Sequence, residues 1–288
     1  MRVHHLNCGT MHPLSRRLVN GTGGLFQAGV MVCHCLLVET ADGLVLVDSG
    51  MGTADLRDPA GSLGRPFVRL TRPRLDAAET ALHQVAELGY RPTDVRHIVL
   101  THLDVDHVGG ISDFPWATVH VHADEHRAAM RPRTRAERYR YRRNQWAHGP
   151  TWATYAGGGE AWFGFDAVRQ LAGLPPEILL VPLAGHTRGH TGVAVDTGSG
   201  WLLHAGEAYF FHGETDPVRP HSTPVLRVFP IIMQTDGAAR RANVARLGEL
   251  RATHGDRVDI VSAHDHVELS RHRRAAGSGA PSHPTVGD

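Results

Sequence analysis

The sequence predicts an α/β fold in one domain, and three observations support it. Apolar runs of strand length alternate along the chain with segments of helical periodicity, as in layered α/β proteins. With 288 residues, 41% of them hydrophobic and 20% charged, the chain is long enough to bury a sizeable core. Residues 275–288 are rich in Gly, Ser and Pro, which is typical of a disordered tail, so we expect one domain over residues 1–274.

The individual elements follow from short-range patterns. Residues 75–88 are amphipathic with the spacing of a helix, and the apolar run at 98–100 that follows them is typical of a buried strand. Further apolar runs end in turns rich in glycine or polar residues, which indicates more strands of the same kind. These runs lie at residues 44–47, 181–183, 192–195, 201–204 and 258–261.

A cluster of side chains that can bind metal follows the strand at 98–100. His102, Asp104, Asp106 and His107 lie within a stretch of six residues. Imidazole nitrogens and carboxylate oxygens are ligand types that zinc and similar divalent cations accept. A strand that ends in a sharp turn can aim the first two at one point and the last two at a neighbouring point. This arrangement suits two cations about 3.5–4 Å apart, the geometry of metal-assisted hydrolysis.

The opposing interpretation is that a chain with 22 histidines has produced this cluster by chance on an exposed loop. Further ligands elsewhere in the chain decide between the two. Three other predicted strands each end in such a residue, namely His186, Glu207 and His264. Four strand ends that each deliver a histidine or a carboxylate describe one metal centre at the rim of a sheet.

These motifs resemble the metallo-β-lactamase superfamily, whose members carry an HxHxDH motif, a downstream histidine, a bridging aspartate and a terminal histidine. The match spans nearly the whole chain, from the strand and turn at 44–52 to His264. The resemblance implies a four-layer αββα sandwich with two divalent cations at one edge. Asp48 would lie beneath the site and orient ligands. The implied ligands are His102, Asp104 and His186 for one cation, Asp106, His107 and His264 for the other, and Glu207 as the bridge.

Two positions depart from the family pattern. Asp104 stands where a second histidine is usual, and Glu207 stands where the bridging aspartate is usual. Both residues remain donors, but they make the site more anionic, which suits manganese or iron better than a nitrogen-rich site does. We therefore expect two divalent cations and name zinc only as the default metal. The longer Glu207 stem leaves open whether it bridges both cations.

Several other histidines lie near these motifs. In the family pattern HTxGH the first histidine binds metal and the second supports it, which assigns these roles to His186 and His190. We expect His204 and His266 to be neighbours of the site, because the coordination shell of one ion has no room for all of them.

The resemblance implies hydrolysis of a carboxylic ester, with a lactone as the first choice, by a hydroxide that bridges the two metals. Asp106 is expected to be catalytic as well as a ligand. Tyr209 is expected to hydrogen-bond the carbonyl or leaving oxygen, as a nearby tyrosine does in lactonases of the superfamily, and its alternative role is a core aromatic. The motifs look most like the lactonase and glyoxalase-like branch.

Other activities remain open at this point. A thioester hydrolase of the glyoxalase kind, a phosphodiesterase and a sulfur dioxygenase with one iron are the rival enzymes. The non-enzymatic alternative is a binding module in which the metals only stabilise the fold, but it leaves an open coordination position unexplained. The substrate, the native metal and the oligomeric state are not fixed by the sequence.

Residues 126–164 break the α/β rhythm, because they are rich first in arginine and then in aromatic residues. In this superfamily an insertion in this region commonly walls the active-site cleft. Under that interpretation Trp146, Trp152 and Trp162 line an apolar pocket. A solvated basic helix packed by its own aromatic residues is an equally good alternative.

Composition excludes some functions. All thirty basic residues are arginine, so Schiff-base chemistry and the lysine-containing phosphate loop are excluded. A formal net charge of +1 gives no reason to expect nucleic acid as a partner, and a small molecule is the expected one. No apolar run has the length of a membrane span. Three cysteines, expected to be reduced, complete the expectation of a cytoplasmic protein.

Overall fold

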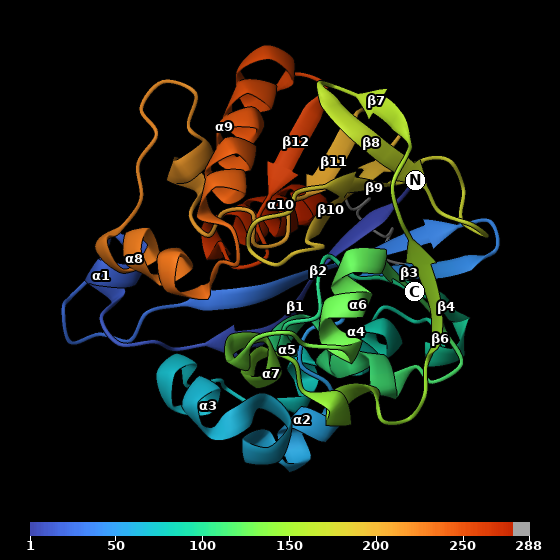
Figure 1. Cartoon of the computed structure of the whole chain (residues 1–288), viewed down its shortest axis with the longest axis horizontal. Coiled ribbons are helices and arrows are strands. Elements are labelled where there is room, and N and C mark those ends of the chain that lie inside the picture. The colour runs from blue at the N-terminus through green and yellow to red at the C-terminus, as the bar shows by residue number, and fades with distance from the viewer. Residues whose placement is uncertain (279–288) are drawn as a thin grey trace, which may run out of the picture.

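The computed structural model describes residues 1–278, which form two six-stranded β-sheets (Figure 1). The first sheet is mixed, because β1, β2 and β3 pair in antiparallel fashion whereas β3 to β6 run parallel. Its strands follow the order of the chain: β1 (Val3–Met11), β2 (Met31–Thr40), β3 (Gly43–Val47), β4 (Val95–Val99), β5 (Thr118–His122) and β6 (Thr151–Tyr155).

The second sheet is built from the second half of the chain. Its strands pair in antiparallel fashion except β11 and β12, which run parallel. The strands are β7 (Glu160–Trp162), β8 (Phe165–Gln170), β9 (Ile178–Pro182), β10 (Thr191–Asp196), β11 (Trp201–His204) and β12 (Val258–Val261).

Apolar side chains alternate between two cores, as the twofold period of a strand requires. In β3, Leu44 and Leu46 belong to a core shared with the helices outside the first sheet. Val45 and Val47 point the other way, into the core between the sheets. Both faces of β3 are thus buried, which explains its unbroken apolar sequence.

Helices cover the outer faces of both sheets. Ala81 and Val85 of α4 and Ala128 of α6 pack on the first sheet, while Leu247 and Leu250 of α9 pack on the second (Figure 1). The layers are therefore helix, sheet, sheet and helix, and the expected αββα fold is confirmed. The helices are α1 (Arg16–Asn20), α2 (Thr53–Arg57), α3 (Arg65–Thr71), α4 (Ala81–Glu87), α5 (Val105–Val108), α6 (Ala123–Met130), α7 (Arg135–Arg140), α8 (Pro224–Met233), α9 (Gly237–His254) and α10 (His266–Ser278).

The predicted helix at 75–88 is shorter in the structure. A 3₁₀ turn occupies Ala77–Glu79, and α4 begins at Ala81 because Thr80 caps it. Thr80 has extended backbone angles and its hydroxyl accepts a hydrogen bond from the backbone N–H of His83. Hydrophobic periodicity continued across this cap and hid the boundary.

The predicted tail at 275–288 overlaps the structured part of the chain. Helix α10 continues to Ser278, and residues 279–288 lie outside the described part. Within residues 1–278, no helix is both long enough and apolar enough to cross a membrane. The three cysteines are buried free thiols, as expected.

Candidate metal centre

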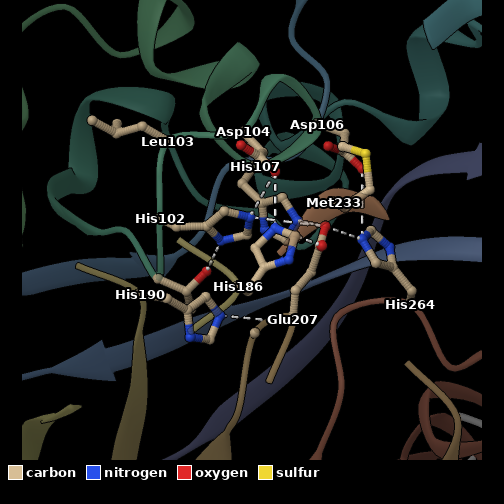
Figure 2. A network of polar contacts seen from close by, with 12 residues as sticks. His102, Leu103, Asp104, Asp106, His107, His186, His190, Glu207, Met233 and His264 are labelled. Carbon is tan, nitrogen blue, oxygen red and sulfur yellow. Dashed lines mark hydrogen bonds and ion pairs between the residues drawn. The ribbon is translucent and has the colours of Figure 1, made fainter. Parts of the chain in front are cut away.

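The topology brings the predicted strand ends to one place. Parallel strands end at the same edge of a sheet, so Asp48 after β3 lies close to the segment after β4 that carries His102. In the second sheet, parallel β11 and β12 likewise deliver Glu207 and His264 three residues after their last residues. The first and second sheets meet at this edge, and the side chains converge there (Figure 2).

Two groups of buried side chains could each hold a metal ion. The ligand atoms in each group lie within 4.8 Å of one another. What we call the first group consists of His102, Asp104, His186 and Glu207, and the second group consists of Asp106, His107, Glu207 and His264. All seven residues singled out from the sequence are therefore together in the fold, in the two expected sets.

Glu207 belongs to both groups because its two oxygens face different histidines. Oε2 lies 2.9 Å from Nε2 of His186 in the first group. Oε1 lies 3.1 Å from Nε2 of His107 and 2.7 Å from Nε2 of His264 in the second group. The longer glutamate stem therefore reaches the histidines of both groups, as a residue that bridges two cations must.

The backbone at Glu207 is fixed from the preceding residue. Gly206 has φ 54°, and a Cβ there would lie 2.6 Å from Nε2 of His190. This close approach lets the backbone N–H of Glu207 donate a hydrogen bond of 2.9 Å to the same nitrogen. Nδ1 of His190 in turn bonds to the carbonyl of Leu183 at 3.1 Å. Both nitrogens of His190 are thus occupied, and this residue supports Glu207; the family pattern implied a supporting role for His190 but not this partner.

The ring orientations of His264 and His107 are each set by a partner on the nitrogen that points away from Glu207. Nδ1 of His264 bonds to the carbonyl of Val32 at 2.7 Å, which turns Nε2 toward Glu207. Nδ1 of His107 bonds to Asp48 at 2.8 Å, with the same result. Such partners fix the tautomer that leaves a lone pair on the nitrogen facing a metal.

Asp48 holds the segment after β4 from beneath. Its carboxylate accepts hydrogen bonds of 2.8 Å from the backbone N–H and the hydroxyl of Thr101, and it pairs with His107. Burial would raise the pKa of Asp48, but the His107 imidazole outweighs this and lowers it to about 2. Asp48 has φ 54°, a left-handed conformation that costs energy and is often found at functional sites.

The donor atoms fit a cation. Thr101 donates its hydroxyl proton to Asp48, so its oxygen accepts from Nδ1–H of His102 and leaves a lone pair on Nε2. That nitrogen is buried and, within residues 1–278, has no hydrogen-bond partner. It lies 3.5 Å from Asp104 Oδ2 and 3.8 Å from Glu207 Oε1. Burial lowers the pKa of His102 to about 4, so the ring is neutral near pH 7. Buried lone pairs that face one another are unfavourable without a cation between them.

The charges around Glu207 and His264 also favour positive charge at this centre. Burial opposes the charged form of Glu207, yet His186 and His264 hold its pKa well below the usual range. Burial likewise opposes protonation of His264, but Glu207 and Asp106 raise its pKa. The carboxylates therefore attract cations strongly enough to overcome burial.

A cavity of about 240 Å³ opens on these residues, and its walls are mainly apolar. Carboxylates of Asp104, Asp106 and Glu207 lie on its floor together with His264. The apolar wall residues come from β1 and the loop after it, α1, β2, the segment 63–71, α5 and α8: Met11, Pro13, Val19, Met31, Leu63, Pro66, Phe67, Leu70, Val105, Val225, Leu226, Phe229 and Met233.

The expectation that three tryptophans line this cavity is wrong. Trp146 belongs to the core of the first sheet, Trp152 packs against that core, and Trp162 belongs to the core of the second sheet. Apolar side chains can fill a core as well as a cleft, and their sequence pattern does not distinguish the two. The region 126–164 contributes Tyr139, Arg140 and Arg142 to the cavity instead, and its strands β6 and β7 form one edge of each sheet.

The expected catalytic role of Tyr209 is also contradicted. Its side chain is fully buried in the core beneath α9, and its hydroxyl donates to both oxygens of Glu268 at 3.0 Å. His204 and His266 lie outside both groups, as expected. His204 bonds to the carbonyl of His34 at 2.6 Å.

Arg140 is the residue at this centre that sequence reasoning did not single out. Its guanidinium Nε lies 3.4 Å from Asp104 Oδ1. It is one of seven arginines between residues 131 and 143, and no sequence signal separates it from the others. The walls of the cavity were missed too, although the apolar segment 225–233 was a usable signal.

Comparison with known proteins identifies the family. The model of the metallo-beta-lactamase superfamily matches residues 28–257. The chain belongs to the metallo-β-lactamase superfamily. A probable metallo-hydrolase of Mycobacterium tuberculosis is 46% identical over 265 residues, which covers 92% of this chain and 80% of that protein. The chain is therefore a metallo-hydrolase of this superfamily.

More distant relatives are lactonases. The N-acyl homoserine lactonase AttM of Rhizobium johnstonii is 35% identical over 136 residues, which covers 46% of this chain and 49% of that protein. Among solved structures, Bacillus thuringiensis AiiA with N-decanoyl-L-homoserine bound at its active site has a TM-score of 0.67 at 20% identity. The similarity covers 93% of the present chain and 95% of the AiiA chain. At this identity the similarity shows the fold alone.

Proposed function

We propose that this chain is a dinuclear metallo-hydrolase that cleaves a carboxylic ester, specifically a lactone with an apolar portion. The observation that carries the proposal is the position of Glu207, whose two oxygens face the histidines of two separate groups. A carboxylate shared in this way suits two cations about 3.5–4 Å apart. The distant relatives named as lactonases support the choice of ester.

The cavity supports a substrate that joins an apolar chain to a carbonyl. Its apolar walls suit a hydrocarbon chain, and its floor consists of residues from both groups. The N-decanoyl-L-homoserine seen in AiiA combines an acyl chain with a polar head in the same way. We therefore infer that an acyl-substituted lactone is the preferred substrate class.

In this proposal the ligands are the seven residues of the two groups. A pair of divalent cations, when bound, lowers the pKa of water and polarises a carbonyl. Zinc is the default, and manganese or iron is compatible with the three carboxylates. Glu207 spans the groups, Asp48 orients His107, and the apolar walls keep bulk water from the ester.

We assign Asp106 as the catalytic residue among these ligands. Its carboxylate lies on the cavity floor, 3.6 Å from Nε2 of His264. From this position its oxygen can take up the proton that water releases when it attacks the ester, and can return it to the leaving oxygen. Tyr209 takes no part in this step, because its hydroxyl is bonded to Glu268.

Metal analysis and a substrate panel test the proposal. Purified protein should contain two equivalents of divalent metal and should hydrolyse acyl lactones faster than thioesters or phosphodiesters. A single equivalent of iron with oxygen-dependent turnover would instead indicate a sulfur dioxygenase. Within a lactone series, each added methylene that the cavity buries should raise kcat/KM by up to about fourfold, because burial stabilises by about 0.8 kcal/mol per methylene.

Matched variants connect the activity to the site. Asp106→Ala and His107→Ala should abolish lactone hydrolysis, while Asp42→Ala and His83→Ala, which change exposed residues of the same types, should leave it unchanged. Full hydrolytic rates in the first pair would overturn the proposal.

A further inference from the structure

Arg140, the last residue of α7, turns its guanidinium inward toward the first group. Its side chain is 9% exposed, and Nε lies 3.4 Å from Asp104 Oδ1. Nη1 donates to the carbonyl of His186 at 3.0 Å, and Nη2 donates to the carbonyl of Met233. One rigid guanidinium thus connects α7, the turn after β9 and the end of α8 to Asp104.

The two oxygens of Asp104 have different neighbours. Oδ1 faces Arg140, whereas Oδ2 lies 3.0 Å from Nε2 of His186 and 3.5 Å from Nε2 of His102. The contact with Arg140 is an ion pair without a hydrogen bond, and its attraction for Oδ1 favours the orientation in which Oδ2 faces the histidines. Arg140 therefore determines how Asp104 faces the two histidines of its group.

Charge gives Arg140 a second role. Asp104 and Glu207 place two carboxylates in a buried site, and burial of unpaired charge is costly. The Arg140 guanidinium, with Nε 3.4 Å from Asp104 Oδ1, compensates one of these negative charges. In the second group, Asp106 faces His264 at 3.6 Å, and Asp48 backs His107. One group is thus backed by a cation and the other by an anion.

We propose that Arg140 is a positioning residue for the first group: it neutralises Asp104, aims Oδ2 at His102 and His186, and thereby sets the metal affinity of this group but not of the second. The inference rests on the proposed metal centre. It predicts that the effect of Arg140 on metal affinity depends on the negative charge of Asp104.

A double-mutant cycle tests this dependence. The full chain is stripped of metal and titrated with Co²⁺, and the two binding steps are followed by visible absorbance and by elemental analysis. Arg140→Met should weaken one step by about 10–100-fold, the usual cost of losing a partner of a metal ligand, and leave the other within about twofold. Arg138→Met changes an exposed arginine of the same helix and should alter neither step.

The same Arg140 variants are then made in a second background, Asp104→His, in which a neutral donor replaces the carboxylate. In this background Arg140→Met should change Co²⁺ affinity by less than about twofold, because the charge that Arg140 neutralises is gone. Arg140→Lys keeps a cation near Asp104 and should lose less affinity than Arg140→Met. It also allows the same comparison if the methionine variant does not fold.

The outcomes separate this inference from the proposed function. Equal losses in both backgrounds would overturn the inference, because they would show that Arg140 acts only through its bonds to the carbonyls of His186 and Met233. Unchanged or tighter binding in Arg140→Met would overturn it as well. A wild-type chain that binds fewer than two equivalents would overturn the dinuclear proposal, whereas the cycle would still test the equivalent that Asp104 holds.

Discussion

Two buried glutamates, Glu207 and Glu268, have opposite surroundings. Both are almost fully buried, at 5% and 3% exposure. Glu207 faces the imidazole nitrogens of three histidines at 2.7–3.1 Å, and a neighbouring nitrogen, His102 Nε2, has no partner among the described residues. Glu268 accepts hydrogen bonds from the Tyr209 hydroxyl, the Ser262 N–H and Arg251.

The difference shows how a binding cluster can be distinguished from a structural one. The donors around Glu268 are used up within the cluster, so Glu268 needs no further partner. Around Glu207 three carboxylates share one buried space with His102 Nε2, which has no partner among the described residues, so a cation would make the arrangement favourable. The four predictions below test this contrast.

Removal of Glu207 should have the largest effect, because it serves both groups. We expect Glu207→Ala to lower kcat/KM for the best lactone by more than about 100-fold, since even partners behind metal ligands cost 10–100-fold when lost. Steady-state kinetics and metal analysis measure this. Glu249→Ala, an exposed glutamate on α9, is the control. Two tightly held equivalents in Glu207→Ala would show that the carboxylate is not shared.

Asp48→Asn should have the next largest effect. Asparagine keeps the shape of the side chain but removes the charge that orients His107, so we expect metal affinity and kcat/KM to fall by about 10–100-fold. Asp42→Asn, at an exposed position, is the matched control. Wild-type affinity in Asp48→Asn would mean that His107 does not need this partner.

Glu268 should make stability depend on pH. Burial, followed by the nearby charge of Asp265, raises the pKa of Glu268 to about 7, from an ordinary value of 4.5. The folded chain therefore binds this proton more tightly than the unfolded chain, and stability falls as pH rises from about 4.5 to about 7. Relative to Glu268→Gln, wild type should lose up to about 1.4 kcal/mol per pH unit in this window.

Urea denaturation of metal-saturated protein at several pH values measures this dependence. Lactone hydrolysis by Glu268→Gln should stay close to wild type, because the residue does not line the cavity. Parallel pH profiles for the two proteins would contradict the raised pKa.

Tyr209→Phe should have the smallest effect. It removes one buried hydroxyl that donates to Glu268, so we expect a loss of about 1 kcal/mol in the free energy of unfolding. The value of kcat for the lactone should stay within about twofold of wild type. A much larger loss of kcat with the fold intact would restore the catalytic role that the sequence suggested.

The sequence predicted one metal centre because the convergence of its ligands depends on topology, whereas the assignment of His186, Glu207 and His264 to the two groups came from the family resemblance. Each ligand follows a strand end, and parallel strands bring such ends to the same edge. Asp104 and Asp106 could be divided between the two groups because the strand at 98–100 ends in a sharp turn. These features require no knowledge of side-chain packing.

Other features depend on packing and could not be predicted. Tyr209 lies two residues beyond Glu207, but the chain turns there into the core beneath α9, so its hydroxyl points away from the ligands. Trp146, Trp152 and Trp162 fill cores and not the cavity, because side-chain packing and not the local sequence decides where they point. Arg140 reaches Asp104 only because α7 packs beside the turn after β9, a tertiary contact with no local signal.

The central claim is that two cations share Glu207, and electron paramagnetic resonance of the Mn²⁺-loaded chain tests it most directly. Ions about 3.5–4 Å apart with a common carboxylate interact magnetically. We predict that the second equivalent of Mn²⁺ converts the spectrum of an isolated ion into that of a coupled pair. A spectrum at two equivalents that is simply twice the spectrum at one would contradict the claim.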